Sequence, residues 1–356
     1  MLYRTQQDFE RFKCIADRCP KSCCIGWQIV IDDSSIEKYQ NTRGDFTNRL
    51  QSSIDFDEHC FIQNHHRCSM LNDSGLCDLH STLGEDYLCD TCRLYPRHAE
   101  EFLDIREYSL SLSCPEAVRM LLKPDYDFKI TESQDDSFDD EDDFEDFDFL
   151  VFDKLAYARD KMFEVASDRS LDLQARMKIV AEAAYKLQVL FDEGEIFEMD
   201  NVINDMTKNQ DDKIHSDSSH ASLSPDYLTD SLEVLLDMEV LEESWRDSIL
   251  SCQNFWKEKN RSSDEWHAAM YPSDDLEYVF EKVLKSLLFS YFCGAIYDGQ
   301  IYARAMIAVQ SIRWLMMLYY TSDEDSPAST IYLYSREVEH SDININSLIS
   351  FFEEDL

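Results

Sequence analysis

Apolar residues recur at helical spacing through the second half of the chain. Steps of three and four residues separate them over 173–191, 280–292 and 301–319, which places the apolar side chains of each stretch on one helical face. In the first stretch these residues are Leu173, Met177, Val180, Ala184, Leu187 and Phe191. We therefore predict a helical bundle over residues 149–356, interrupted near 201–225 by a polar loop rich in Asp, Ser, Asn and His.

The first 122 residues have a different, short-range pattern. Residues 27–31 alternate enough to predict one strand, and Gly75 and Gly84 mark turns. A small module with irregular loops held by a metal fits this pattern better than a regular sheet, because metal binding supplies folding energy that so little apolar surface cannot. The predicted fold is mainly α: a cysteine-rich, metal-binding domain over 1–122 and then the helical domain.

An acidic segment, residues 123–148, separates these two parts and includes the run QDDSFDDEDDFEDFD. Like charges at this density repel one another, so we expect a disordered linker. Phe138, Phe144 and Phe147 interrupt the charges and leave a second interpretation, in which the segment docks on a basic groove.

The whole chain is strongly acidic, with 73 acidic against 33 basic residues and a formal net charge of −40. Such a field repels phosphates, so nucleic acid is disfavoured as a partner. One interpretation of this charge is that it attracts a partner rich in lysine. The other is that the charge only keeps the protein soluble or reflects adaptation of its source to salt. Both interpretations stay open.

We expect a cytoplasmic protein without membrane contact. The chain starts with the polar stretch MLYRTQQDFERFK, which has no apolar core of a signal peptide. The most apolar stretch, 301–320, contains Arg304, Gln310 and Arg313, so it is predicted to be a buried helix rather than a membrane span. Glutathione keeps cytoplasmic thiols reduced, which disfavours a disulfide framework.

Ten of the twelve cysteines lie in the first third of the chain. One cluster comprises Cys14, Cys19, Cys23 and Cys24, a second comprises Cys68, Cys77, Cys89 and Cys92, and Cys60 and Cys114 stand apart. Thiolates at short spacings in a reducing compartment usually bind metal, and four of them suit either Zn²⁺ or a [4Fe–4S] cluster. Structural zinc usually shows two CxxC pairs and only one occurs here, so the spacing favours iron–sulfur, with zinc as the alternative.

Other candidate residues have plain structural interpretations. His65, His66 and His80 lie near the clusters and can act as nitrogen ligands, although surface histidines are the commoner outcome. Cys252 and Cys293 are predicted to be buried, inert thiols among apolar neighbours. The chain has only seven glycines and contains no GxGxxG, GxxxxGK[ST], GxSxG, HExxH or CxxxCxxC run, so any cofactor binds in a manner that these motifs do not describe.

The order of the motifs resembles the bacterial flagellin lysine N-methylases, which belong to a wider group of CxxxCC zinc- or iron-chelating proteins. The matching pieces are CPKSCCIGWQIVID from residue 19, the C-x-M-L-N-D-S-G-L-C run over 68–77, LGEDYLCDTCRLYPR over 83–97 and SLSCPEAVRML over 111–121. Later segments at 167–180 and 297–315 are also similar to the family, so the resemblance covers most of the chain.

The resemblance implies methyl transfer from S-adenosylmethionine to the ε-amino groups of flagellin lysines, with an iron–sulfur cluster in the enzyme. The cluster candidates that it implies are Cys14, Cys19, Cys23, Cys24, Cys68, Cys77 and Cys92, with Cys89 and Cys114 ranked lower.

The catalytic residues stay unknown at this stage. Methylation needs a neutral amine, so a group near the substrate must accept a proton from a lysine whose free pKa is about 10.4. Glu85, Asp86, Tyr87 and Tyr95 are weak candidates for this role, and solvated turn residues are the commoner outcome. The alternative function is a non-catalytic zinc- or iron-binding module whose helical domain is a platform for a partner.

Overall fold

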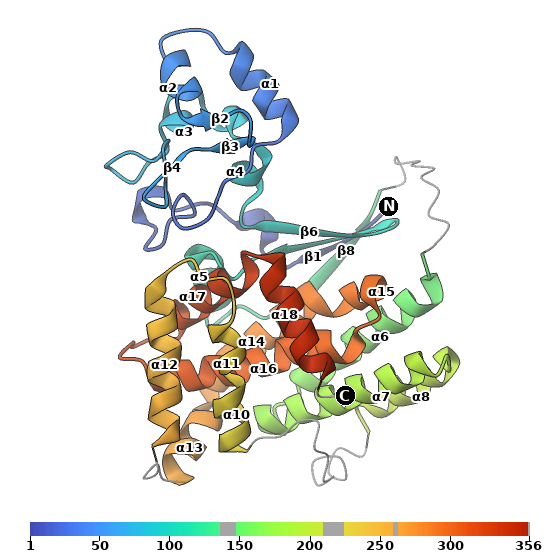
Figure 1. Ribbon diagram of the computed structural model, residues 1–356. Helices are drawn as coiled ribbons and strands as arrows, with labels where there is room; N and C mark the ends of the chain where they lie inside the picture. Colours follow the sequence, from blue (N-terminus) through green and yellow to red (C-terminus); the bar gives the residue numbers. More distant parts are fainter. Residues whose placement is uncertain (136–146, 209–223, 259–262, 355–356) are drawn as a thin grey trace.

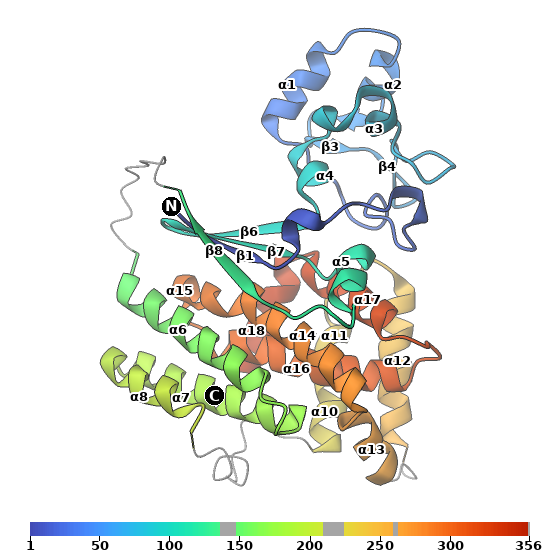
Figure 2. The same ribbon diagram turned by 180° about the vertical axis from the view of Figure 1, so that it is seen from behind.

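The computed structural model describes residues 1–135, 147–208, 224–258 and 263–354. The densest part of the acidic segment and most of the predicted loop at 201–225 lie outside these residues. In the described part of the chain, no helix is long and apolar enough to cross a membrane. Figures 1 and 2 show a small lobe above a sheet and a large group of helices below it.

The sheet has four strands in the order β6-β7-β1-β8. Its strands are β1 (Leu2–Gln6), β6 (Arg97–Phe102), β7 (Ile105–Leu110) and β8 (Ile130–Gln134). β1 pairs with β7 in parallel, and the other two pairings are antiparallel. The prediction of a disordered linker over 123–148 was therefore wrong for residues 130–134, because their backbone groups pair with β1.

The lobe is formed by residues between β1 and β6, and it contains most of the cysteines. Its helices are α1 (Asp33–Asn41), α2 (Thr47–Gln51), α3 (Asp78–Leu83) and α4 (Asp90–Leu94), with 3-10 turns η1 (Phe9–Arg11), η2 (Ala16–Arg18) and η3 (Glu85–Tyr87). Two short ribbons pair β2 (Ile54–Asp55) with β3 (Cys60–Phe61) and β4 (Gln63–Asn64) with β5 (Arg67–Cys68). Residues 27–31 do not form the predicted strand; this part of the chain makes only isolated bridges, Ile25 to Arg67 and Val30 to Cys60.

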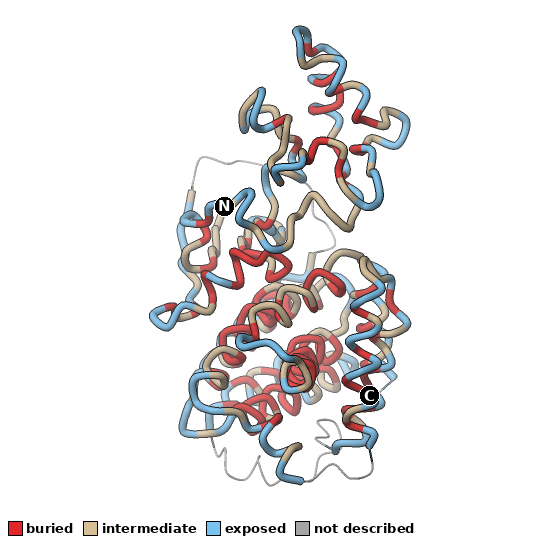
Figure 3. The backbone as a smooth tube through the Cα atoms, turned by 90° about the vertical axis from the view of Figure 1, so that its left-hand side faces the viewer, coloured by how far each residue is buried: buried red, intermediate tan, exposed pale blue. Residues whose placement is uncertain are grey.

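Figure 3 shows that the lobe mixes buried and exposed positions, whereas burial is more continuous in the helices. The lobe's small core contains Ile29, Ile31, Ile36, Tyr39, Leu50, Ile54, Phe61, Cys68, Met70, Leu79 and Cys89. This core is small, and the thiols of Cys68 and Cys89 lie within it.

The rest of the described chain is helical, which confirms the mainly α prediction. Its helices are α6 (Phe149–Ala166), α7 (Leu173–Asp192), α8 (Met199–Asp205), α10 (Pro225–Ser231), α11 (Glu233–Leu236), α12 (Glu243–Lys257), α13 (Ser263–Met270), α14 (Asp274–Tyr291), α15 (Ala295–Asp298), α16 (Ile301–Tyr320), α17 (Ala328–Glu339) and α18 (Asp342–Glu353), with 3-10 turns η4 (Ile196–Glu198) and η6 (Phe292–Gly294). The three stretches with helical periodicity became α7, α14 with η6, and α16.

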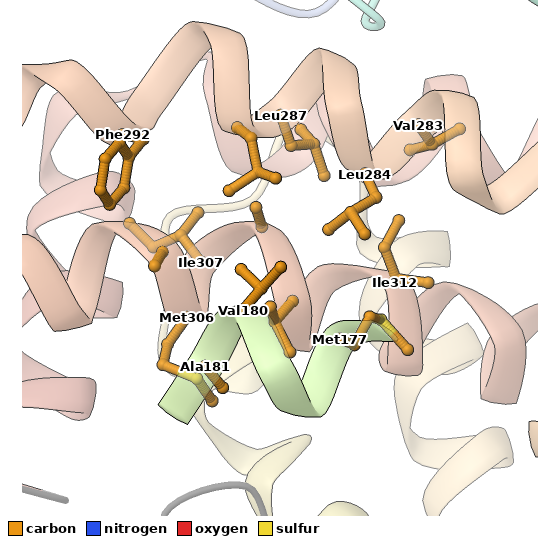
Figure 4. Packing of buried hydrophobic residues seen from close by; sticks show 14 of the residues in the cluster. Met177, Val180, Ala181, Val283, Leu284, Leu287, Phe292, Met306, Ile307 and Ile312 are labelled. Atoms are coloured by element: carbon orange, nitrogen blue, oxygen red, sulfur yellow. The ribbon is translucent and has the colours of Figure 1, made fainter. Parts of the chain in front are cut away.

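Helix α16 lies at the centre of the bundle and packs against α7, α14 and α18. It is apolar around most of its circumference, as expected of a helix enclosed on all sides. Figure 4 shows its Ile307 and Ile312 between Val180 of α7 and Leu284 of α14. Asp172 accepts a hydrogen bond from Ala175 N at 2.8 Å and so caps the start of α7.

A buried ion pair joins the sheet to the bundle. Arg159 of α6 and Glu107 of β7 are each 1% exposed in their side chains, and two guanidinium nitrogens of Arg159 donate to the two carboxylate oxygens of Glu107. Arg159 also donates to Phe289 O at 3.1 Å, and its guanidinium carbon lies 4.7 Å from the centroid of the Phe289 ring. This paired geometry holds the sheet, and with it the base of the lobe, against α6 and α14.

Candidate metal centre and its surroundings

The loop that carries Cys19, Cys23 and Cys24 runs along the β4–β5 ribbon of the lobe. Cys68 N donates to Cys24 O at 2.8 Å, and Gly26 N donates to His66 O at 2.8 Å. Gly26 has a φ of +108°, a backbone conformation that side chains with a Cβ rarely adopt. These contacts bring cysteines from the two sequence clusters together.

Three further cysteines stand immediately before helices of the lobe and its base. Cys77 precedes α3, Cys89 precedes α4, and Cys114 precedes α5 (Pro115–Leu121). The first turn of a helix has backbone N–H groups without intrahelical partners and favours negative charge. Backbone N–H groups lower the pKa of Cys77 and Cys114, but burial outweighs them and raises both pKa values, whereas the pKa of Cys89 is lowered, mainly by its hydrogen bond with Cys92.

Two neighbouring pairs of thiols are each linked by a hydrogen bond that shifts their pKa values in opposite directions. The hydrogen bond from Cys23 to Cys24 raises the pKa of Cys23 well above its ordinary value and lowers the pKa of Cys24 to about 7. A hydrogen bond between Cys92 and Cys89 has the same effect: it raises the pKa of Cys92 and lowers the pKa of Cys89. Each pair thus has one sulfur that ionises readily.

Charge interactions connect these pairs with the remaining lobe cysteines. Burial raises the pKa of Cys68 to about 12, and the nearby thiolates of Cys24, Cys77 and Cys89 raise it further. The pKa of Cys92 is similarly raised by Cys24, after its hydrogen bond and its burial. Charge interactions and hydrogen bonds thus link the pKa values of six thiols of the lobe: Cys23, Cys24, Cys68, Cys77, Cys89 and Cys92.

The other three candidate ligands, Cys14, Cys19 and Cys114, influence one another's charge. Burial raises the pKa of Cys114 to about 11, and the charges of Cys19 and Cys14 add to this. Cys19 Sγ donates to Lys21 O at 3.2 Å, whereas exposed Cys14 accepts a hydrogen bond from Ala16 N at 3.4 Å. The charges of Cys14 and Cys114 also raise the pKa of Cys23, after its hydrogen bond with Cys24 and its burial.

All twelve cysteines are unbridged thiols. Within the described residues, no three or more His, Cys, Asp or Glu side chains are arranged as a site for a single metal ion. His65 and His66 form the exposed turn between β4 and β5, and His80 is exposed on α3. Cys252 and Cys293 are buried in the bundle, as predicted, at 0% and 1% exposure.

An arginine from the helical domain reaches the cysteine loop. Arg336 of α17 is 1% exposed; its Nη2 donates to Ile25 O at 2.7 Å, and its guanidinium carbon lies 4.2 Å from the centroid of the Trp27 ring. Its Nη1 is buried and has no hydrogen-bond partner in the described part of the chain. Burial raises the pKa of Cys19, and the charge of Arg336 acts in the opposite direction, so the two groups are neighbours.

An unpaired cation beside gathered thiols fits an anionic, thiolate-bound metal group. A buried N–H of a guanidinium without an acceptor is costly, by about 1–3 kcal/mol or more, and a sulfur ligand of such a group can accept from it. The donor set, which is rich in soft sulfur, is the one that iron–sulfur clusters and zinc prefer.

The four weak catalytic candidates divide between two places. Glu85, Asp86 and Tyr87 form η3, where Tyr87 O accepts from Tyr39 OH at 2.6 Å and the first two side chains are exposed. Tyr95 instead packs against Trp27, with ring centroids 5.5 Å apart. Burial raises the pKa of Tyr95, and the charges of Cys114 and Cys23 raise it too.

Tyr95 begins a chain of hydrogen bonds that ends at a carboxylate. Its hydroxyl lies 3.1 Å from Ser113 Oγ, which lies 2.6 Å from Ser111 Oγ, and Ser111 donates to Glu339 Oε2 at 2.9 Å. Burial raises the pKa of Glu339, so this carboxyl group holds a proton more readily than a solvated one. We call this chain, Tyr95–Ser113–Ser111–Glu339, the Tyr95 relay.

The sequence pointed to neither Arg336 nor Glu339. Both lie on α17, three residues apart and so on one face of the helix, which is the face directed at the cysteine loop and the base of the lobe. In the sequence this spacing looks like an ordinary charged helix surface, because the contacts that give it meaning are more than 200 residues distant.

The fold and site define a class of protein in which a cysteine-rich lobe is attached to a helical domain that contributes charged groups to the lobe. A sequence model of the FliB lysine N-methylase C-terminal domain matches residues 159–356, more than half of the chain. The chain belongs to the FliB lysine N-methylase family.

Curated relatives agree with this assignment. A lysine-N-methylase of Salmonella typhimurium (strain LT2) is 32% identical over 130 residues, which are 32% of this chain and 31% of that protein. The flagellar biosynthetic protein FliU of Salmonella muenchen is 32% identical over 128 residues, covering 32% of this chain and 73% of FliU. The matched segment thus spans about a third of the length of the first relative. No solved structure matches the chain.

Proposed function

We propose that this protein is a lysine N-methyltransferase that moves a methyl group from S-adenosylmethionine to ε-amino groups of flagellin, with an iron–sulfur cluster bound by its lobe cysteines. The family and the names of the relatives support lysine methylation. The name FliU supports flagellin as the protein substrate. We place the reaction in the cytoplasm, where thiols stay reduced.

The Tyr95 relay is the observation that best supports catalysis over metal binding alone. An ε-ammonium group must lose its proton before nitrogen can attack a methyl group, and its free pKa is about 10.4. In the proposal the Tyr95 hydroxyl faces the amine, and the two serines pass the proton to the Glu339 carboxylate. The raised pKa of Glu339 brings its affinity for a proton closer to that of the amine.

The metal group is assigned to the lobe thiols. Cys23, Cys24, Cys68, Cys77 and Cys92 are the first candidates to hold it, and the unpaired Nη1 of Arg336 offsets its negative charge. The group would supply a site for polar atoms of the methyl donor or a redox centre. The alternative is a zinc ion bound by the same cysteines.

The electrostatics of the chain suit a lysine-rich substrate. A net charge of −40 attracts cationic surfaces over about 8 Å at physiological salt. Methylation retains the charge of a lysine while it removes donor hydrogens, so product formation changes the hydrogen bonding of the lysine rather than its charge.

The test is co-expression with the flagellin of the same organism, followed by mass spectrometry of flagellin peptides. Each transferred methyl adds about 14 Da, and this modification should disappear in the Glu339→Gln and Ser111→Ala variants. A matched control is Cys252→Ala, which changes a buried thiol of α12 that is not part of the relay and should leave methylation intact.

Unmodified flagellin in the presence of soluble, metal-loaded protein and S-adenosylmethionine would refute the methyltransferase proposal. That result would favour the alternative, a metal-binding module with a helical platform for a partner. Normal methylation by Glu339→Gln would refute the relay alone.

A further inference from the structure

Strand β6 forms one edge of the four-stranded sheet. Among the strands that the structure describes, it pairs with β7 alone. Figures 1 and 2 show that β6 begins beneath the lobe and runs above α15. An edge strand presents a row of backbone N–H and C=O groups that can pair with another chain.

The register of the hairpin fixes which backbone groups of β6 face the open side. A two-residue turn joins β6 to β7, and the residues that flank such a turn pair with each other by hydrogen bonds. These bonds alternate along an antiparallel pair, so Arg97, Ala99 and Glu101 direct their N–H and C=O groups away from β7. One contact agrees with this assignment: the Tyr297 hydroxyl of α15 donates to Glu101 O.

The edge is open at Arg97 and Ala99. In the described part of the chain, the outward backbone groups of these two residues have no hydrogen-bond partner, whereas Glu101 O has Tyr297. Ala99 is exposed, and the pairing with β7 runs without a bulge over all six residues of β6. Edge strands that face only water are commonly protected by lysine, proline or a bulge, and β6 contains none of these. The edge therefore has the regular geometry that a further strand needs.

The open part of β6 begins beside the Tyr95 relay. Tyr95 is two residues before Arg97, so their Cα atoms lie within about 7 Å of each other. Ser111, the third member of the relay, donates its backbone N–H to Pro96 O at 2.8 Å. A strand added along β6 lies about 4.8 Å from it, so one end of the added strand reaches the place where the relay begins.

The charge of the chain decides between two possible occupants of this edge. Two copies of the chain that met edge to edge would bring together two net charges of −40, and their repulsion opposes such a pair. A lysine-bearing segment is attracted by the same charge. Strand addition gains affinity from main-chain hydrogen bonds, so it holds an extended segment and leaves its side chains to alternate between the two faces.

We propose that an extended, lysine-bearing segment of the protein substrate adds to the sheet as a fifth strand, paired with the outward backbone groups of Arg97 and Ala99. The target lysine lies at the end of this segment that is next to Tyr95. The inference rests on the proposed function for the identity of the substrate, and it adds how the substrate is held.

The test replaces Ala99 by proline. Proline removes the outward N–H, and its ring obstructs an approaching strand, whereas the pairing with β7 does not use this N–H and stays intact. Binding of monomeric flagellin from the same organism to metal-loaded protein is measured by isothermal titration calorimetry. The affinity of Ala99→Pro should fall about tenfold or more, the equivalent of roughly 1.4 kcal/mol.

Gln134→Pro is the matched control, because it introduces the same ring on the opposite edge of the sheet. Asp135 exchanges two backbone hydrogen bonds with Met1, so the N–H of the exposed Gln134 points away from β1. This variant should bind flagellin as the wild type does. Circular dichroism shows whether both variants are folded.

Measurements on the wild-type protein cover the case in which Ala99→Pro does not fold. Hydrogen exchange followed by mass spectrometry should show slower exchange over residues 97–101 when flagellin is added, because the outward N–H groups gain partners. Two versions of a lysine-containing flagellin peptide, N-methylated at alternate sets of backbone nitrogens, should also differ in affinity. Only one set of N–H groups of an added strand faces β6, so only one version should lose binding.

The outcomes separate this inference from the proposed function. Equal binding by Ala99→Pro and Gln134→Pro, or unchanged exchange over 97–101, would overturn the strand addition even if flagellin is methylated. Binding that depends on Ala99, together with unmodified flagellin, would support the strand addition and refute the proposed activity. A wild-type dimer that Ala99→Pro abolishes would mean that a second copy occupies the edge, and absence of flagellin binding would overturn the inference outright.

Discussion

Replacing Arg336 by methionine should loosen the attachment of the cysteine loop to the helical domain. The substitution removes the charged hydrogen bond to Ile25 O, which contributes about 1.5–3 kcal/mol, and the contact with Trp27, which contributes about 0.5–2 kcal/mol. Methionine retains an apolar stem of similar length, so little packing is lost. We expect the free energy of unfolding to fall by about 2–4 kcal/mol.

A double-mutant cycle isolates the contact between the guanidinium and the indole ring. The four proteins are the wild type, Arg336→Met, Trp27→Leu and the double variant, each unfolded by urea under anaerobic conditions with its metal bound. The two substitutions should show a coupling free energy of about 1 kcal/mol, because both remove the same 4.2 Å contact. Arg11→Met is the control; its side chain is 79% exposed and pairs only at the surface with Asp8, so it should change stability by less than about 0.5 kcal/mol.

Two results would refute this reasoning. A coupling free energy within about 0.3 kcal/mol of zero would mean that the guanidinium and the indole contribute independently. A loss of stability for Arg336→Met no larger than that of Arg11→Met would mean that the arginine does not hold the loop.

Three further predictions concern stability and metal content. Arg159→Met should cost about 3–5 kcal/mol because it removes both hydrogen bonds to the buried Glu107 carboxylate and leaves it the longer 3.7 Å contact with Arg4. Changing Glu107 to Leu as well should recover part of this cost in urea unfolding, and no recovery would contradict the pairing. Burial raises the pKa of Glu337 from its ordinary 4.5 to about 7. The contribution of this carboxyl group to stability is therefore complete below pH 4.5, and up to about 3 kcal/mol of the free energy of unfolding is lost as the pH rises to about 7. Glu337→Gln should flatten the dependence of stability on pH, and an unchanged profile would contradict this prediction. Cys68→Ser should remove iron from anaerobically purified protein, whereas Cys293→Ala should not. Metal analysis and absorption near 400 nm measure the iron content. A colourless wild-type protein that contains zinc alone would refute the iron assignment.

The bundle could be predicted because its signal is local. The apolar repeat within 173–191 is itself the buried face of α7, and the capping Asp172 stands directly before it. The sheet could not be predicted in the same way. β1 pairs with β7 in parallel across about a hundred residues, and its sequence LYRTQ has no apolar alternation that would distinguish it from a loop.

The wrong strand at 27–31 has a related cause. Alternation in the sequence reflects burial on one side, and Ile29 and Ile31 are indeed buried in the lobe core. Their backbone groups, however, meet only scattered partners, such as Phe61 N donating to Ile29 O at 3.0 Å. A loop that packs two isoleucines inward thus has the same pattern as a strand.

The candidate site was predictable only where its residues cluster in the sequence. Cys19, Cys23 and Cys24 lie within six consecutive residues, so their spacing alone predicted that they bind metal. Glu339 and Ser111 are 228 residues apart, and neither belongs to a motif.

The two halves of the chain have to be considered as one functional unit. Ser111 and Tyr95 belong to the half that carries the cysteines, whereas Glu339 and Arg336 belong to the half that matches the family's C-terminal domain. The Tyr95 relay therefore exists only when α17 is docked on the base of the lobe. The same helix places a cation beside the thiols, so displacement of α17 would disconnect the proposed proton acceptor and expose the charge of the metal group in one movement. A helical domain that served only as a platform for a partner would need neither contact, and this is the physical reason to favour catalysis at the junction.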